Sequence, residues 1–232
     1  MKYYSLLFEC DDFIVIDKFS GISVHKDQAE SGLTMQLSSD FNRPLFLVHR
    51  LDKVTSGVMV FAKHQEAAAQ LSALFACHQV QKFYLAISAK KPSKKQGTIK
   101  GDMSKSRRGM WKLEKTTLNP AITRFFSCSI GDGLRMFLVK PQTGKTHQIR
   151  VALKSIGAPI LGDSIYSNDQ GADRTYLHAL QISFVFADQF YQFRSDPSYG
   201  ERFLTDTVER QLAEWAEPNQ LCWPGQQERK NV

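Results

Sequence analysis

Apolar residues recur with two different spacings along the chain, and the two kinds of segment follow one another in mixed order. Short continuous apolar runs bounded by turn residues are typical of buried strands, whereas apolar residues at i, i+4 and i+7 indicate one face of a helix. The second pattern predicts a helix after Lys63 and another between Thr146 and Gly157. The first predicts strands over residues 13–17, 45–48, 58–61, 82–88, 122–130, 134–139 and 176–187.

Turn and cap residues make some of these boundaries sharper. Gly131-Asp132-Gly133 separates two strand-like runs and predicts a hairpin turn. Thr146 is a suitable cap for the later helix, and Gly157 suits the position just past its C-terminus. Strands and helices do not alternate strictly, so the sequence predicts an α+β fold with a mixed, largely antiparallel sheet and flanking helices.

The length of 232 residues is enough for one sizeable core, and we expect a single domain over residues 1–232. An apolar stripe near the C-terminus predicts a helix over about residues 203–217. Residues 218–232 are expected to be a frayed tail. The stripe consists of Phe203, Leu204, Val208, Leu212 and Trp215.

Composition excludes several classes of protein. No apolar stretch reaches the 18 residues that a membrane span needs, and the N-terminus lacks the apolar segment of a signal peptide, so we expect a cytoplasmic protein without a membrane partner. The four cysteines lie far apart and form no Cys-x-x-Cys pair, which argues against a zinc knuckle or a redox motif. We expect no bound metal.

Positive charge is concentrated in one part of the chain. The net charge is +7, and residues 90–115, the basic segment, hold ten Lys or Arg against Asp102 and Glu114. Such a segment is either a solvated surface or a contact for a polyanion. Trp111 lies among these cations, and an aromatic in such a setting suits stacking on nucleic-acid bases. The candidate RNA-backbone contacts are Lys94, Lys95, Arg107 and Arg108.

Residues 49–63 hold the strongest chemical signal. Asp52 stands between Arg50 and Lys53, near His49, on a loop that leads into an apolar strand-like run. Nearby cations keep a carboxylate ionised at neutral pH. Such a group can attack an electron-poor carbon or coordinate a partner, but it is a poor proton donor. The plainer alternative is a turn residue paired with Arg50.

The second informative block covers residues 140–153. Its helix would present Lys145, His147 and Arg150 close to a helix N-terminus, and both cations and helix N-termini attract phosphate. An ordinary amphipathic surface helix is the alternative.

Together these blocks resemble the RluA family of RNA pseudouridine synthases. The string His-Arg-Leu-Asp-Lys-Val-Thr-Ser-Gly at residues 49–57 resembles the signature loop of that family, and Thr-Gly-Lys-Thr-His-Gln-Ile-Arg at 143–150 resembles a second motif. Lys-Phe-Tyr-Leu-Ala at 82–86 and Ile-Leu-Gly-Asp at 160–163, with Tyr166, follow in the family's order. The likeness runs from about residue 8 to about residue 186. It departs from the family at Phe19, where proline is usual, and at Lys145, where arginine is commoner.

The resemblance implies a role for each matching residue. Asp52 would be the catalytic carboxylate, and Arg150 would pair with it although 98 positions separate them. Tyr84 would stack on the target base and help to remove the C5 proton. The family fold would place these residues in a central RNA-binding cleft, with no small N-terminal RNA-binding domain ahead of it. Further RNA contacts are expected from Arg50, Lys53, Lys145, His147 and Gln148.

The implied function is isomerisation of specific uridines in rRNA or tRNA to pseudouridine by a monomer. The reaction breaks the C1′–N1 bond and joins C1′ to C5 without any change of oxidation state, so neither cofactor nor metal is required. One alternative is a non-catalytic RNA-binding or RNA-remodelling protein on the same fold. An RNA methyltransferase would need a glycine-rich turn between a strand and a helix, but the only Gly-x-Gly here links two strand-like runs.

Overall fold

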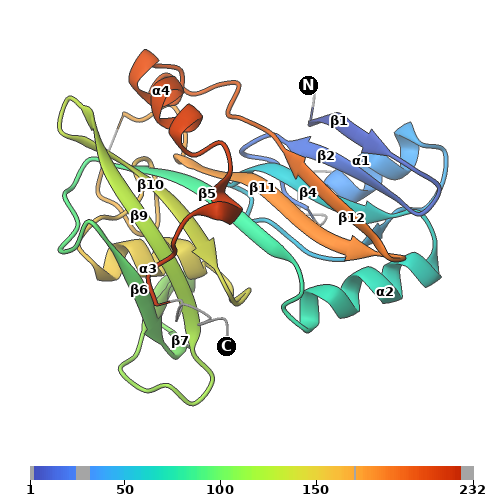
Figure 1. The fold of residues 1–232 in the computed structure, drawn as a ribbon, viewed down its shortest axis with the longest axis horizontal. Helices are drawn as coiled ribbons and strands as arrows, with labels where there is room; N and C mark the ends of the chain where they lie inside the picture. Colours follow the sequence, from blue (N-terminus) through green and yellow to red (C-terminus); the bar gives the residue numbers. More distant parts are fainter. Residues whose placement is uncertain (1–2, 25–31, 170, 226–232) are drawn as a thin grey trace, which may run out of the picture. The chain divides into compact units, whose positions relative to one another are not determined.

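The computed structural model describes residues 3–24, 32–169 and 171–225, and the chain divides into two compact units (Figure 1). Unit 1 consists of Met1–Tyr84 and Leu177–Ser198, and unit 2 consists of Leu85–Tyr176 and Tyr199–Val232. Each unit therefore takes two separate segments of the chain. That the two act as one catalytic domain stays a prediction.

Unit 1 is built on a sheet with the order β1-β2-β4-β11-β12, and β3 pairs with β4. The β4–β11 pair is parallel, and the other pairs are antiparallel. The elements are β1 (Tyr4–Glu9), β2 (Phe13–Lys18), α1 (Leu33–Asp40), β3 (Phe46–Leu47), β4 (Ser56–Ala62), α2 (Gln65–Ala76), the first half of β5 (Gln81–Ser88), β11 (Leu177–Phe186) and β12 (Gln189–Arg194).

Both faces of β2 and β4 are buried, which explains why these strands read as continuous apolar runs. Alternate residues of a strand point to opposite faces. Phe13 and Val15 pack in one cluster with Leu71 of α2, whereas Ile14 and Ile16 pack in another with Leu37 of α1. The two helices thus cover opposite faces of the same strands.

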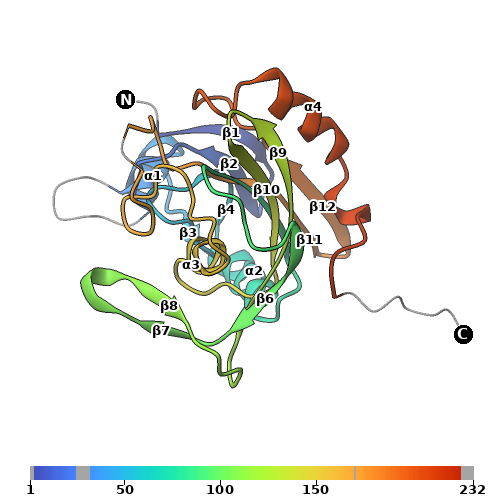
Figure 2. The same ribbon diagram turned by 90° about the vertical axis from the view of Figure 1, so that its left-hand side faces the viewer.

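Unit 2 contains the strand order β5-β10-β9-β6 and a separate two-stranded hairpin, β7–β8, which continues from the end of β6 (Figure 2). None of the helices in the described part of the chain is long and apolar enough to cross a membrane. The elements are the second half of β5, β6 (Gln96–Gly101), β7 (Met103–Lys105), β8 (Trp111–Leu113), β9 (Ala121–Gly131), β10 (Leu134–Pro141), α3 (Gln148–Ser155) and α4 (Asp206–Glu214), with 3₁₀ turns at Arg107–Gly109 and Pro218–Gln220.

The predicted fold class, α+β with a mixed and largely antiparallel sheet, is confirmed. The hairpin turn is also as predicted, since Gly131, Asp132 and Gly133 all have positive φ between β9 and β10. The strand expected over residues 45–48 is only two residues long. The sequence pattern did not reveal β1, α1 or β12.

The predicted cap of α3 is wrong. The helix begins at Gln148, and its N-cap is His147, which has φ 56° and makes no side-chain capping bond. The Gln148 Oε1 atom instead accepts the backbone N–H of Lys145 at 3.0 Å. The C-terminus is as predicted, because Gly157 follows the C-cap residue with φ 81°.

The C-terminal expectations need two corrections. Helix α4 is shorter than residues 203–217, and Leu204 is 59% exposed because it precedes the helix. Residues 218–225 are not frayed, since Trp223 is 2% exposed and packs against Phe126. Its Nε1–H donates to the Pro218 carbonyl at 2.8 Å. Residues 226–232 lie outside the described part of the chain.

Gly57 allows the close approach of β4 and β11 directly after the Asp52 loop. Its φ is +112°, and an added Cβ would lie 2.2 Å from the Ala179 carbonyl oxygen. We predict that Gly57→Ala lowers the free energy of unfolding by at least about 2 kcal/mol, because it combines backbone strain with a backbone clash. Urea denaturation measures this change.

Gly97→Ala is the matched control, because an added Cβ there meets its nearest atom, in the Phe125 ring, at an ordinary 3.7 Å. We expect little change in its stability. Equal stabilities for the two variants would contradict the close packing at Gly57.

Candidate active site

Residues 49–55, the Asp52 loop, are fixed in place by the buried ammonium group of Lys18. Lys18, the last residue of β2, has no exposed surface. Its Nζ donates to the carbonyls of Phe19 at 2.9 Å, Ile22 at 3.0 Å and Lys53 at 3.3 Å. A buried cation is costly unless polar groups surround it, so these carbonyls must keep their positions. The loop is thereby fixed to the turn that follows β2.

Two further hydrogen bonds fix the backbone around the carboxylate. The Ser20 hydroxyl donates to the Val54 carbonyl at 2.6 Å, and the Thr55 amide donates to the Asp52 carbonyl at 3.0 Å. Asp52 itself is half-buried, whereas the neighbouring Arg50 and Lys53 are exposed. The loop therefore holds its carboxylate in a defined place and presents two cations to solvent.

His49 supports the loop and is not placed to transfer protons. Its Nε2 atom accepts the backbone N–H of Val60 in β4 at 2.9 Å, and its ring stacks on Phe75 of α2 at 4.3 Å. Burial, helped by the charge of Lys82, lowers the pKa of His49 to about 3. The ring is neutral at physiological pH, which the bond from Val60 requires.

Unit 1 brings Tyr84 close to Asp52. Tyr84 is the last residue of β5 within unit 1 and packs against the cluster that contains Ile16 and Met59. Burial, and secondly the negative charge of Asp52, raise the pKa of the Tyr84 phenol well above its usual range. The phenol is therefore protonated at neutral pH and can donate a hydrogen bond but not act as a phenolate.

Arg150 of α3 makes a buried bidentate ion pair that the sequence did not reveal. Its Nε and Nη2 atoms donate to the two carboxylate oxygens of Asp163, each at 2.7 Å. Both side chains are almost fully buried. Burial opposes ionisation of Asp163, but bonds from Arg150 and from the Ile165 and Tyr166 amides outweigh it and lower the pKa of the carboxyl.

Gln148 has a structural place. It is 5% exposed, and its Oε1 accepts from the Thr143 hydroxyl and the Lys145 amide. Its Nε2 donates to the Ile122 carbonyl and the Thr123 hydroxyl. All four hydrogen-bonding positions of the amide are used within unit 2. The expectation that Gln148 contacts RNA is therefore not supported, because contact would break one of these bonds.

Two predicted residues that precede α3 lie nearer the surface. His147 is half-buried, and its Nδ1 lies 2.8 Å from the Tyr166 hydroxyl. Lys145 is also half-buried, and its Nζ donates to the Asn119 side chain at 2.9 Å. Both remain accessible to a ligand in part.

The basic segment falls on two separate loops of unit 2. Lys94 and Lys95 are exposed on the loop between β5 and β6, and Arg107 is exposed on the turn of the β7–β8 hairpin, next to Arg108. The six residues of β6, about 20 Å of extended chain, separate the loop of Lys94 and Lys95 from the β7–β8 hairpin. These cations form two candidate contacts.

The predicted residues thus divide between the units. Unit 1 holds Arg50, Asp52, Lys53 and Tyr84, and unit 2 holds the remainder. Within unit 1, the negative charge of Asp52 raises the pKa of the Tyr84 phenol, so these two side chains lie close together. The pairing of Asp52 with Arg150 stays a prediction.

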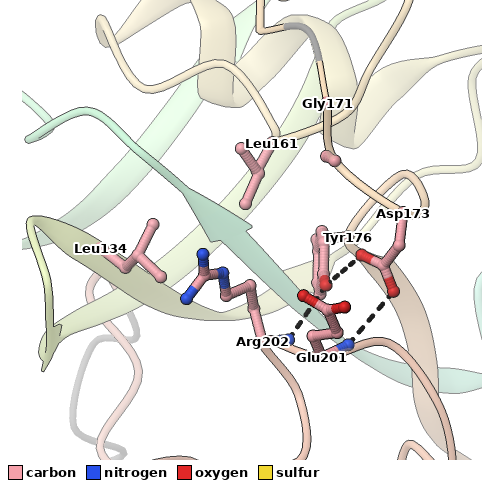
Figure 3. Close-up of a pocket in the computed structure, with 8 residues that line it drawn as sticks. Leu134, Leu161, Gly171, Asp173, Tyr176, Glu201 and Arg202 are labelled. Carbon is pink, nitrogen blue, oxygen red and sulfur yellow. Dashed lines mark hydrogen bonds between the residues drawn. The ribbon is translucent and has the colours of Figure 1, made fainter.

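A pocket of about 210 Å³ lies elsewhere in unit 2, and none of the predicted site residues lines it (Figure 3). Across residues 3–24, 32–169 and 171–225, no three His, Cys, Asp or Glu side chains gather as metal ligands would. The pocket is lined by Leu134, Leu161, Gly171, Ala172, Asp173, Tyr176, Glu201 and Arg202.

Comparison with known proteins identifies the family. Residues 12–155, which include the Asp52 loop, Tyr84 and Arg150, match the family model described as RNA pseudouridylate synthase. The chain belongs to this family. An uncharacterized RNA pseudouridine synthase of Haemophilus influenzae is 53% identical over 209 residues, covering 89% of this chain and 93% of the relative.

More distant relatives agree. The ribosomal large subunit pseudouridine synthase C of Rickettsia bellii is 34% identical, over 85% of this chain and 70% of the relative. Human RNA pseudouridylate synthase domain containing 1 shares the fold with a TM-score of 0.75 at 22% identity, covering 92% of this chain and 95% of the human chain. The predicted family and activity are confirmed: the protein is an RNA pseudouridine synthase, an isomerase that acts on RNA.

His49 gives the synthase a specific acid sensitivity. Its pKa lies below that of a histidine in the unfolded chain, near 6.5, so its stabilising bond is fully present above pH 6.5 and weakens as pH falls towards 3. We predict that the wild type loses about 1–2 kcal/mol more unfolding free energy than His49→Gln between pH 7 and pH 5. Glutamine keeps an acceptor for Val60 but does not titrate. Urea denaturation at both pH values measures this, and parallel losses would contradict it.

Proposed function

We propose that this synthase isomerises uridines of large-subunit rRNA, with Asp52 as the catalytic carboxylate. The observation that carries the assignment is the Asp52 loop, which fixes one carboxylate beside a half-buried tyrosine and two exposed cations. The choice of RNA is supported by the name of the Rickettsia bellii relative. An rRNA substrate would also fit a cytoplasmic enzyme.

The reaction makes one demand that an ionised carboxylate meets. The C1′–N1 bond breaks, and the electron pair leaves with the uracil ring. Asp52 either adds to C1′ or removes a sugar proton to give a glycal, and both routes remain open. The base then turns and C5 bonds to C1′, while the bond from Asp52 to C1′ breaks or, on the glycal route, the sugar regains its proton. The C5 proton then leaves, which restores the C5–C6 double bond, and N1 takes up a proton. No atom is imported and no electron is lost.

Tyr84 is assigned to positioning the uracil. Tyr84 lies within β5 close to the carboxylate, where its ring can stack on a base that has left the helix. The raised pKa of its phenol makes a phenolate base unfavourable at neutral pH. Removal of the C5 proton is therefore assigned to a water that the Tyr84 hydroxyl orients.

Arg150 is assigned to orienting Asp52. Asp163 holds the Nε and Nη2 edge of the guanidinium, which fixes the plane of the group. A guanidinium carries five N–H donors in a rigid fork, so a group whose plane Asp163 fixes can also orient a second carboxylate, here assigned to Asp52. Asp163 would then act on the catalytic carboxylate through the arginine.

RNA binding requires the target uridine to leave its stack, which costs a few kcal/mol. Arg50, exposed two residues before Asp52, is assigned to fill the vacated space. The two cation clusters of unit 2 are assigned to the sugar-phosphate backbone at separate points. Lys53, Lys145 and His147 are assigned to nearby phosphates.

We predict that Asp52→Asn abolishes turnover by at least about four orders of magnitude, because it removes the charge and keeps the shape. RNA affinity should be equal or higher, since an anion is removed. Release of tritium from 5-tritiated uridine in large-subunit rRNA measures turnover. The same variant should fail to restore pseudouridine to the rRNA of cells that lack the gene.

Asp11→Asn is the control, because Asp11 is exposed on the turn before β2 and should leave turnover unchanged. More than a few per cent activity in Asp52→Asn would rule out the mechanism. Restoration of pseudouridine by the wild type in tRNA alone would rule out the rRNA target.

The assignment of Arg150 is best tested by Arg150→Lys, since alanine would leave the Asp163 carboxylate buried without a cation beside it. Lysine keeps the charge but loses the fork. We predict a loss of about 100-fold in kcat with RNA affinity within about threefold. In the Asp52→Asn background the same change should add almost nothing, as expected for groups that act together.

Arg174→Lys, at another buried arginine of unit 2, controls for the general effect of the substitution. Single-turnover kinetics separates the chemical step from binding. Multiplicative losses in the double variant would show that Arg150 and Asp52 act independently.

A further inference from the structure

Tyr166 connects three parts of unit 2 that are separate in the sequence. It is 5% exposed and follows Asp163, the partner of Arg150, by three residues. Its backbone amide donates to that carboxylate at 3.2 Å. The ring lies beneath the Arg150 guanidinium, 5.0 Å from ring centroid to Cζ, and Lys154 Nζ lies 5.5 Å from the same centroid.

The Tyr166 hydroxyl reaches further than the ring. It accepts the backbone N–H of Trp111 in β8 at 2.8 Å and lies 2.8 Å from His147 Nδ1 at the start of α3. A hydroxyl that accepts from the amide still has its own proton to donate, and an imidazole Nδ1 atom can serve as a hydrogen-bonding partner for it. One oxygen atom thus joins the β7–β8 hairpin to the helix that carries Arg150.

The point of attachment lies at the neck of the hairpin loop. Trp111 pairs with Lys105 across the ribbon, and only residues 106–110 lie between them. Arg107 is exposed on this loop. A hydrogen bond from the Ser106 backbone N–H to the Met110 carbonyl, at 2.8 Å, closes the loop. A two-stranded ribbon of three residues a side has little stability of its own. Its direction must therefore come from contacts such as the Tyr166 bond.

We propose that Tyr166 is a positioning residue that, through its hydroxyl, sets the cationic hairpin loop relative to α3 so that both meet one RNA backbone. This proposal rests on the proposed contact between the hairpin and RNA. The phosphates at the hairpin loop would then be bound in a fixed register with those at the start of α3. The aromatic ring packs against Arg150, whereas the hydroxyl binds the hairpin at Trp111. A substitution can therefore remove one contact and keep the other.

Tyr166→Phe tests the proposal because it removes the hydroxyl and leaves the ring beneath Arg150. With an unmodified large-subunit rRNA transcript as the probe, we expect KM and Kd to rise roughly five- to thirty-fold, as for the removal of two hydrogen bonds, with kcat within about twofold. The slope of log Kd against log salt concentration should fall by about 0.7 for each phosphate that the hairpin no longer neutralises. Unchanged Kd and salt dependence would overturn the proposal.

A double-mutant cycle separates positioning from general stability. In an Arg107→Ala/Arg108→Ala background, Tyr166→Phe should raise Kd by less than about twofold, because the cations that it directs are already absent. An equal factor in both backgrounds would overturn the proposal. If Arg107→Ala/Arg108→Ala itself leaves Kd unchanged, the hairpin does not contact the RNA, and the role of Tyr166 is overturned with it.

Tyr176→Phe is the matched control. Its hydroxyl also accepts a backbone amide, from Arg202 at 3.0 Å, and donates to a side chain, Asp173, at the pocket of unit 2 (Figure 3). We expect Tyr176→Phe to lower Tm by about as much as Tyr166→Phe does, but to leave Kd unchanged. A rise in Kd equal to that of Tyr166→Phe would show a merely structural effect and overturn the proposal. These Kd comparisons do not depend on turnover, so a wild type that converts no uridine in the transcript would refute the rRNA target alone.

Discussion

The Asp52 loop depends on the burial of one ammonium group. Lys18 ends a fully buried strand of unit 1 and donates to the carbonyls of two segments, the turn after β2 and the Asp52 loop. Because no exposed surface remains to this lysine, its charge can be satisfied only if both segments keep their paths. The position of the Asp52 backbone is therefore set by the core beneath it, and the neighbouring cations Arg50 and Lys53 are exposed.

Much of the framework follows from local pattern. The buried strands β2 and β4 are apolar on both faces, and the β9–β10 hairpin has three residues with positive φ at its turn, so both are visible in the sequence. Strand β1 and helix α1 have weak apolar patterns and depend on their partners. Trp223 is buried by Phe126, almost a hundred residues earlier, and no local pattern indicates such a contact.

The candidate site shows the same division. Asp52 can be selected as a candidate because a carboxylate between cations is a local feature, and Arg150 can be selected because it stands near the start of a helix in a motif of the family. The hydrogen-bond partners of these residues could not be predicted from the sequence. These partners arise from tertiary contacts. Arg150 donates to Asp163, His49 accepts from the Val60 amide, and the Gln148 amide uses all its hydrogen-bonding positions within unit 2. Side-chain type indicates what a residue can do, whereas its hydrogen-bond partners determine which of these it does.

The interleaved order of the two units has a consequence for how the protein is made. A chain emerges from the ribosome N-terminus first, and domains made of one continuous segment can fold as they emerge. Here the core of unit 1 needs Ile182, Phe184 and Phe186 of β11, which follow the first and longer segment of unit 2 in the chain. Unit 2 in turn needs Trp223, near the end. Apolar faces of both units therefore stay uncovered until the last segments have been synthesised.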